Sequence, residues 1–128
     1  ALCLGHEGRR VPALQHHAAV VELTGPGWAS GRVRVARTPG DRWRGLRPRP
    51  QGWGLLLSGR SVHGRGMRVP LRVASLDAAG RVRRVAWLRP GGLFFDPGAW
   101  WVLELPAGRP GPPLGMALRV RGRTRPPP

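Results

Sequence analysis

The segment RSVHGRGMRVP, residues 60–70, holds most of the side chains in this chain that could do chemistry. Ser61 and His63 are two residues apart, so in an extended strand both side chains point to the same face. A serine beside a histidine suits nucleophilic catalysis when a carboxylate orients the histidine. The carboxylates that folding would have to bring there are Asp77, Asp96 and Glu104. Because no GxSxG-like turn surrounds the serine, a hydrolase is the third of three functional hypotheses.

The same segment has the composition of a cradle for an anionic group. Gly64 and Gly66 would allow backbone N–H groups to approach an anion, and the neighbouring arginines supply positive charge. We predict a shallow electropositive cleft, without a catalytic residue, that is lined by Arg42, Arg60, Ser61, His63, Arg65, Met67 and Arg68. The segment lacks the Walker and dinucleotide fingerprints, and we expect neither a cofactor nor a metal.

An architectural role for the backbone of this segment is the favoured interpretation, with the anion cradle as its alternative. We predict that residues 60–69 are a glycine-bent crossover into a strand that begins near Pro70, where a missing N–H costs nothing. In that interpretation a hydrogen bond to the backbone holds His63 in place. We expect Met67 to pack inward as flexible filler, with Arg65 and Arg68 in solvent.

The charge of the chain invites a nucleic-acid hypothesis. The formal net charge is +16, and all 22 basic residues are arginine. Lysine, isoleucine, asparagine and tyrosine are absent, whereas Gly, Pro, Arg and Ala abound, a pattern that G/C-rich codon bias produces without selection for binding. The resulting field still attracts polyanions non-specifically at low salt. A basic nucleic-acid-binding module is therefore the second functional hypothesis.

Length and composition limit the class of protein. The 128 residues suffice for one domain, and the single cysteine, Cys3, allows no internal disulfide. No apolar run approaches the roughly 18 residues of a membrane-spanning helix, so we expect a cytoplasmic protein with no membrane span. We predict a flexible extension over residues 1–19, a single β domain over 20–122, and a disordered tail over 123–128.

Hydrophobic alternation predicts a mainly β fold. In GRVRVAR (31–37), Val33 and Val35 should face inward while Arg32 and Arg34 face water. The short connection between residues 76 and 81 suits a hairpin on a type I turn, with Gly80 at positive φ. About seven short strands, typical of a sandwich or barrel, are expected over 20–23, 31–37, 53–57, 70–77, 80–88, 99–105 and 116–122.

One segment, TPGDRWRGL (38–46), instead predicts a short helix. Thr38 is a suitable N-cap, proline follows at the first helical position, and Asp41 lies where a negative charge favours exposed N–H groups. Trp43 and Leu46 would share one face. The helix should end near Gly45.

The tryptophans are expected mainly in the core. This applies to Trp43, Trp87, Trp100 and Trp101, which all lie inside predicted elements. Trp100 and Trp101 are adjacent on a strand and must point to opposite faces. Glu104 shares a face with Trp100, and a carboxylate in such an apolar run needs a partner, for which an arginine is the obvious candidate.

Ordered blocks over residues 33–120 resemble a known family, domain-of-unknown-function family 192 (DUF192). The blocks are Ala36-x-Thr38-x-x-x-Arg42-x-x-Gly45-Leu46, Gly54-Leu55-Leu56-Leu57, Arg60-Ser61-Val62-His63-x-x-Gly66-Met67-Arg68-x-Pro70, Leu76-Asp77-x-x-Gly80-x-Val82, and VLELPAG at 102–108. The histidine resembles that of a bacterial branch. The resemblance implies a jelly-roll-like β-sandwich or barrel with one short helix, and no known activity. Members usually carry an aspartate where this chain has Arg72, which argues against carboxylate-dependent chemistry.

The leading hypothesis is therefore a small non-enzymatic binding or accessory module. Its cleft would lie near residues 60–70 and the 38–46 helix. Its partner would be a small anionic ligand or a protein.

Overall fold

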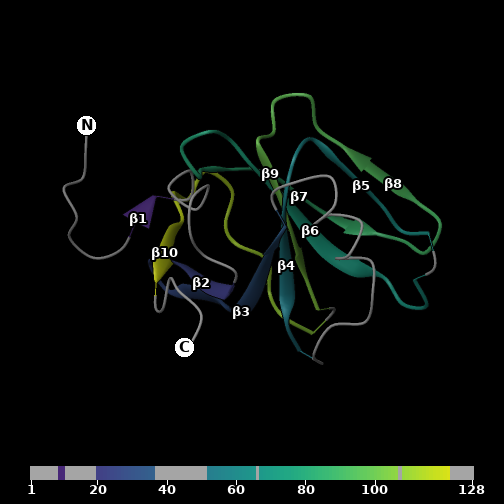
Figure 1. Ribbon diagram of the computed structural model, residues 1–128, viewed down its shortest axis with the longest axis horizontal. Coiled ribbons are helices and arrows are strands. Elements are labelled where there is room, and N and C mark those ends of the chain that lie inside the picture. The colour runs from purple at the N-terminus through teal and green to yellow at the C-terminus, as the bar shows by residue number, and fades with distance from the viewer. Residues whose placement is uncertain (1–8, 11–19, 37–51, 66, 107, 122–128) are drawn as a thin grey trace.

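The computed structural model describes residues 9–10, 20–36, 52–65, 67–106 and 108–121 (Figure 1). These residues form a mainly β fold, as the sequence predicts, and contain no helix. The strands are β1 (Arg9–Arg10), β2 (Val20–Gly25), β3 (Trp28–Ala36), β4 (Gly54–Ser58), β5 (Ser61–His63), β6 (Leu71–Leu76), β7 (Val82–Leu88), β8 (Leu93–Phe95), β9 (Trp101–Leu105) and β10 (Arg119–Arg121).

Eight strands make one sheet in the order β1-β10-β2-β3-β4-β9-β6-β7. All neighbours are antiparallel except β3 and β4. The sheet curls so that residues 115–118 reach the start of β7, where the Val82 N–H donates to the Met116 carbonyl at 2.9 Å. Arg81 and Ala117 form a single bridge there. Because β1 and β7 do not pair as strands, the sheet is not closed into a barrel.

The two faces of the sheet carry separate hydrophobic clusters. The first lies on the concave face and includes Val33, Leu76 and Leu103. The second lies on the opposite face, where β5 and β8 pair as a two-stranded ribbon and cover it. Val62 and Phe94 from this ribbon pack there with residues of β4, β6 and β9. The ribbon is thus fixed to the sheet by apolar packing, and its other face is turned outward.

All seven predicted strands are present. Val33 and Val35 are buried on β3 and Arg32 is exposed, as the alternation indicates. In the β6–β7 hairpin the Gly80 N–H donates to the Asp77 carbonyl at 2.9 Å, and Gly80 has a φ of 87°. β1, β5 and β8 are additional; each has two or three residues, too few for a periodic pattern to form.

The expectation that Trp87 and Trp100 lie in the core is wrong. Trp101 is buried, but Trp100 points to the opposite face, as adjacent strand residues must, and is exposed there. Trp87 is half-exposed because it lies on β7, at the end of the sheet order, where it stacks with Arg72 of β6; the guanidinium carbon is 4.3 Å from the ring centre.

Several predictions concern residues outside those that the structure describes. These are the helix over 38–46 with Thr38, Arg42, Trp43 and Gly45, the glycine at Gly66, and the tail over 123–128. Within the predicted extension over 1–19, Arg9–Arg10 form β1 and pair with β10. In the part of the chain that is described, no helix is long and apolar enough to span a membrane.

Candidate binding face

The β5–β8 ribbon determines where Ser61 and His63 lie. Ser61 is the partner of Phe95 in the antiparallel register, and His63 is the partner of Leu93. Because side chains alternate along a strand, these four share one face, opposite the buried pair Val62 and Phe94. His63, Leu93 and Phe95 are exposed, with 72% of Leu93 and 53% of Phe95 accessible. The predicted pair therefore lies on an outward face that also presents two large apolar side chains.

The loop after β5 has the architecture that the crossover interpretation predicts. The Gly64 N–H donates to the Gly92 carbonyl at 2.8 Å, and the Gly64 carbonyl accepts from the Gly91 N–H at 2.9 Å and from the Met67 N–H at 3.1 Å. A Cβ at Gly64 would collide with the carbonyl oxygen of Arg89. Glycine at this position is therefore required by the close approach of two backbone segments.

The side chains of this loop divide as predicted. Met67 packs against the second cluster, and Arg65 and Arg68 are exposed. Pro70 immediately precedes β6, which begins at Leu71. The predicted placement of these four residues is confirmed.

His63 accepts a hydrogen bond from the backbone N–H of Arg65 through Nδ1, at 3.3 Å. This backbone contact occupies Nδ1 and ties the ring to the loop that follows β5. Asp77 has its partners elsewhere: it caps the β6–β7 turn by accepting from the N–H groups of Ala79 and Arg81 at 2.9 Å each. These hydrogen bonds of His63 and Asp77 do not include one between a carboxylate and His63, which catalysis would need.

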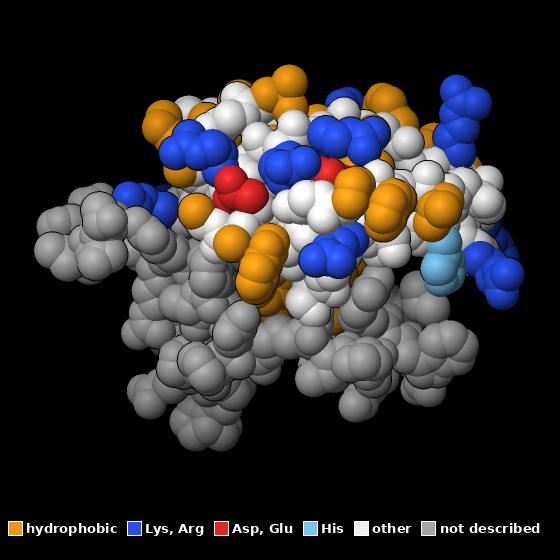
Figure 2. Space-filling view, turned by 90° about the horizontal axis from the view of Figure 1, so that it is seen from above, with side chains coloured by type: hydrophobic (Ala, Val, Ile, Leu, Met, Phe, Trp, Pro, Cys, Tyr) orange, Lys and Arg blue, Asp and Glu red, His pale blue; other side chains and the backbone are white. Residues whose placement is uncertain are grey.

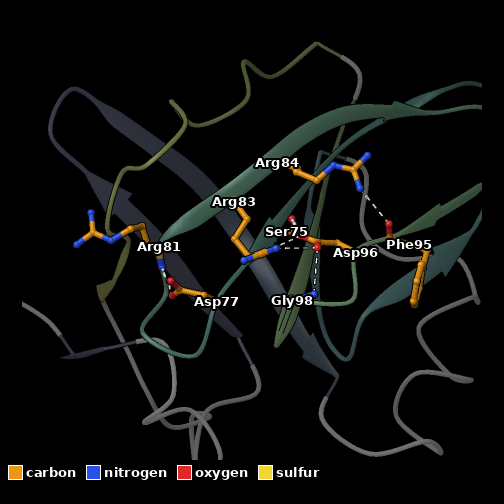
Figure 3. Close-up of polar contacts among 8 residues, drawn as sticks. All are labelled: Ser75, Asp77, Arg81, Arg83, Arg84, Phe95, Asp96 and Gly98. Atoms are coloured by element: carbon orange, nitrogen blue, oxygen red, sulfur yellow. Dashed lines mark hydrogen bonds and ion pairs between the residues drawn. The ribbon is translucent and has the colours of Figure 1, made fainter.

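Asp96 is a buried carboxylate that accepts four hydrogen bonds, and it lies immediately after β8 (Figure 3). Its Oδ2 accepts from the Ser75 hydroxyl at 2.7 Å and from Arg83 Nε at 2.8 Å. Its Oδ1 accepts from Arg83 Nη2 and from the Gly98 N–H, each at 3.1 Å. These donors, Arg83 first, hold the pKa of the buried Asp96 carboxyl well below its ordinary value, against the opposing effect of burial.

This buried carboxylate fixes the turn that connects β8 to β9. The Ala99 N–H donates to the Asp96 carbonyl at 3.0 Å, which closes the turn over residues 96–99. Phe95 precedes the turn and Trp100 follows it. In Figure 3 the Phe95 ring points away from the Arg83–Asp96 pair. Asp96 is therefore a positioning residue for the turn and for its exposed aromatic neighbours.

Arg60 lies between these two aromatic positions. The Gly59 N–H donates to the Trp100 carbonyl at 2.9 Å, and the Asp96 N–H donates to the Arg60 carbonyl at 2.8 Å. The backbone of residues 59–60 is thus bonded at one end to Trp100 and at the other to the residue after Phe95. We call Arg60, Ser61, His63, Leu93, Phe95 and Trp100, with Arg65 and Arg68 of the adjoining loop, the ribbon face.

The ribbon face is electropositive. The acidic residues that the structure describes are Glu22 on β2, Asp77 in the β6–β7 turn, and the buried Asp96 and Glu104. None of these four presents an exposed carboxylate on the ribbon. Figure 2 shows hydrophobic side chains in a row that leads to the histidine, with arginines beside them. An anion there meets arginines without a competing exposed carboxylate.

Of the predicted cleft residues, Arg60, Ser61, His63, Arg65 and Arg68 lie on the ribbon or its adjoining loop, whereas Met67 packs inward and Arg42 lies outside the described residues. Glu104 is buried on β9, between Leu55 and Val73 in the register, and does not reach the ribbon face. Among the described residues no group of His, Cys, Asp and Glu could hold a metal ion.

The sequence prediction missed Leu93, Phe95 and Trp100. A signal for two of them was present: LFFDPGAWW (93–101) has a pair of adjacent aromatic residues on each side of a turn sequence. Adjacent residues on a strand face opposite ways, so one member of each pair must point outward unless both faces are covered.

Comparison with known proteins identifies the fold. No family model matches the chain, and no curated protein does. One similar solved structure is a candidate transcription regulator from Sinorhizobium meliloti, with 23% identity, a TM-score of 0.64, and coverage of 83% of this chain and 97% of that one. Another is a protein of unknown function from Novosphingobium aromaticivorans, with 23% identity, a TM-score of 0.59, and coverage of 78% and 83%. At this identity the likeness establishes a shared fold.

Proposed function

We propose that this chain is a DUF192-type, non-enzymatic binding module and that the ribbon face is where it binds an anionic partner. The observation that carries the proposal is the juxtaposition of Arg60, Arg65 and Arg68 with exposed apolar side chains on a ribbon fixed by its buried side. Exposed apolar side chains gathered on one rigid face are typical of an interaction surface. The arginines favour a partner that carries phosphate or carboxylate groups.

The similar structures are compatible with this proposal. One of them is named as a candidate transcription regulator, which makes a nucleic acid one class of anionic partner to test. The hydrolase hypothesis has less support, because His63 Nδ1 contacts a backbone N–H rather than a carboxylate.

The experiment is a calorimetric titration with inorganic pyrophosphate at 150 mM NaCl. The double variant R65A/R68A should bind at least fivefold more weakly than the unmodified chain, because charge-assisted hydrogen bonds are lost. The control R32A/R121A removes the same charge from exposed positions on β3 and β10, and should leave the affinity within twofold.

An equal loss of pyrophosphate affinity in both double variants would show that binding depends only on the net charge. That result would overturn the assignment of the ribbon face as the binding site.

A further inference from the structure

The aromatic rings of Phe95 and Trp100, at the two ends of the 96–99 turn, are exposed to solvent. Phe95 is 53% exposed and Trp100 is 55% exposed, whereas their neighbours Phe94 and Trp101 are buried at 5% and 2%. The buried member of each pair supplies the packing, so the exposed ring contributes little to the core. An exposed ring leaves its π face open to a planar ligand.

The backbone that carries these rings is fixed by the structure around it. Four donor contacts hold the Asp96 carboxylate in the turn between the rings, and the Ser75 donor is itself buried on β6. The Phe95 carbonyl also accepts from Arg84 Nη1 at 3.0 Å. The turn is therefore tied to both strands of the β6–β7 hairpin. Such fixing lowers the entropy that a ligand must remove when it binds.

Positive charge lies beside the turn that carries the two rings. Arg60 is exposed, and its backbone is bonded to the turn that separates Phe95 from Trp100. Arg65 and Arg68 continue the charge along the ribbon past His63. The backbone of residues 59–60 is therefore bonded to both ends of the turn that carries the two rings, and Arg60 adds an exposed positive charge beside that turn.

We infer that the ribbon face binds single-stranded nucleic acid, with bases stacked on Phe95 and Trp100 and phosphates paired with Arg60, Arg65 and Arg68. This inference rests on the proposed function and names its partner. A single strand offers the two groups that the face can recognise, since every base has a π face and every linkage carries one negative charge. In a duplex the π faces are occupied by neighbouring bases.

An acidic polypeptide is the competing partner, because Leu93 is the most exposed large apolar side chain of the ribbon. The two rings favour the nucleic acid. They lie at the two ends of a turn that is bonded to the backbone of Arg60, whereas an aliphatic side chain offers no stacking surface. The two partners differ in which side chain they need: Phe95 for a base, and Leu93 for an apolar side chain of a protein.

The experiment measures fluorescence anisotropy of labelled dT12 at 150 mM NaCl. Phe95→Leu and Trp100→Leu each keep the charge and an apolar side chain but remove the ring. Each should weaken binding at least fivefold, equivalent to about 1 kcal/mol of lost stacking. Trp87→Leu is the matched control, because Trp87 is half-exposed on the opposite face of the sheet from the ribbon and stacks with Arg72. Its affinity should stay within twofold.

Two further probes separate stacking from charge. Heparin carries charge without bases, so the ring variants should bind it as the unmodified chain does. Leu93→Ser tests the competing partner: it should weaken dT12 binding less than either ring variant does, whereas a loss as large as theirs would indicate that the face needs an aliphatic contact and would overturn the stacking inference.

If the ring variants and the unmodified chain bind dT12 equally, or if none of them binds it, the inference is wrong. The proposed function would then still be decided separately by the pyrophosphate titration of the arginine variants. Thermal melting of each variant checks that it is folded.

Discussion

At the residue scale, the buried acid Asp96 holds the turn that Phe95 precedes and Trp100 follows. The sequence predicts that Trp100 and Trp101 face opposite ways, but not that the Trp100 face is open. Whether that face is covered depends on which segments pack beside β9, and these segments are distant from it in the sequence. The same holds for Asp96, because its partners Ser75 and Arg83 are 21 and 13 residues away in the chain.

Asp96 makes the stability of the fold sensitive to acid. Its pKa in the folded chain lies below the ordinary value of 3.8, chiefly because Arg83 donates to the carboxylate. The unfolded chain therefore binds a proton more readily, so the stabilisation is present above about pH 4 and is lost as the pH falls further. In urea denaturation, Asp96→Asn should lose less free energy of unfolding between about pH 5 and about pH 3 than the unmodified chain, because this range spans the pH at which the loss of stabilisation begins. An equal loss would contradict the assigned role.

At the element scale, the β5–β8 ribbon and the loop after it decide where the candidate residues lie. The sequence predicts the loop well: Gly64 bends it, Met67 packs inward and Pro70 precedes the strand. It does not predict the ribbon, since three-residue strands such as β5 show no usable alternation. The predicted helix over 38–46, with its N-cap Thr38, stays a prediction.

Gly64 gives a test of how this connection is built. Gly64→Ala would press a methyl group against the Arg89 carbonyl oxygen, where rigid backbone must shift, so we expect a loss of about 1–3 kcal/mol in the free energy of unfolding. Gly108→Ala is the matched control, because a Cβ there meets nothing within 4 Å. Chemical denaturation measures both. Equal stability of the two variants would contradict the close approach.

At the scale of the whole molecule, several strands of the sheet contribute to both hydrophobic clusters, and β9 is one of them. β9 contributes Leu103 to the cluster on the concave face and Val102 to the cluster beneath the ribbon. The apolar run over 99–105 predicts a strand covered on both faces, which is confirmed. The sequence does not predict which strands lie beside it, because β4 and β6 come from distant positions and pairing is not encoded in local periodicity.

Because β9 belongs to both clusters, the domain should unfold as one unit. Leu103→Ala removes a fully buried side chain and should cost about 2–5 kcal/mol. The variant should show one transition by far-UV circular dichroism that coincides with the tryptophan fluorescence change. Separate transitions would mean that the ribbon and the curled sheet unfold independently.

The central claim is that one face of this highly basic molecule, the ribbon face, is the binding site. The arginines can be used as probes of where a ligand binds, because they are spread from β10 at one end of the molecule to the ribbon at the other (Figure 1). The most direct measurement is a ¹H–¹⁵N NMR titration with pyrophosphate that follows every arginine Nε–Hε signal. We expect the largest shifts at Arg60, Arg65 and Arg68, with little change at Arg121. Equal shifts across all arginines would contradict the claim and would leave net charge as the whole explanation of binding.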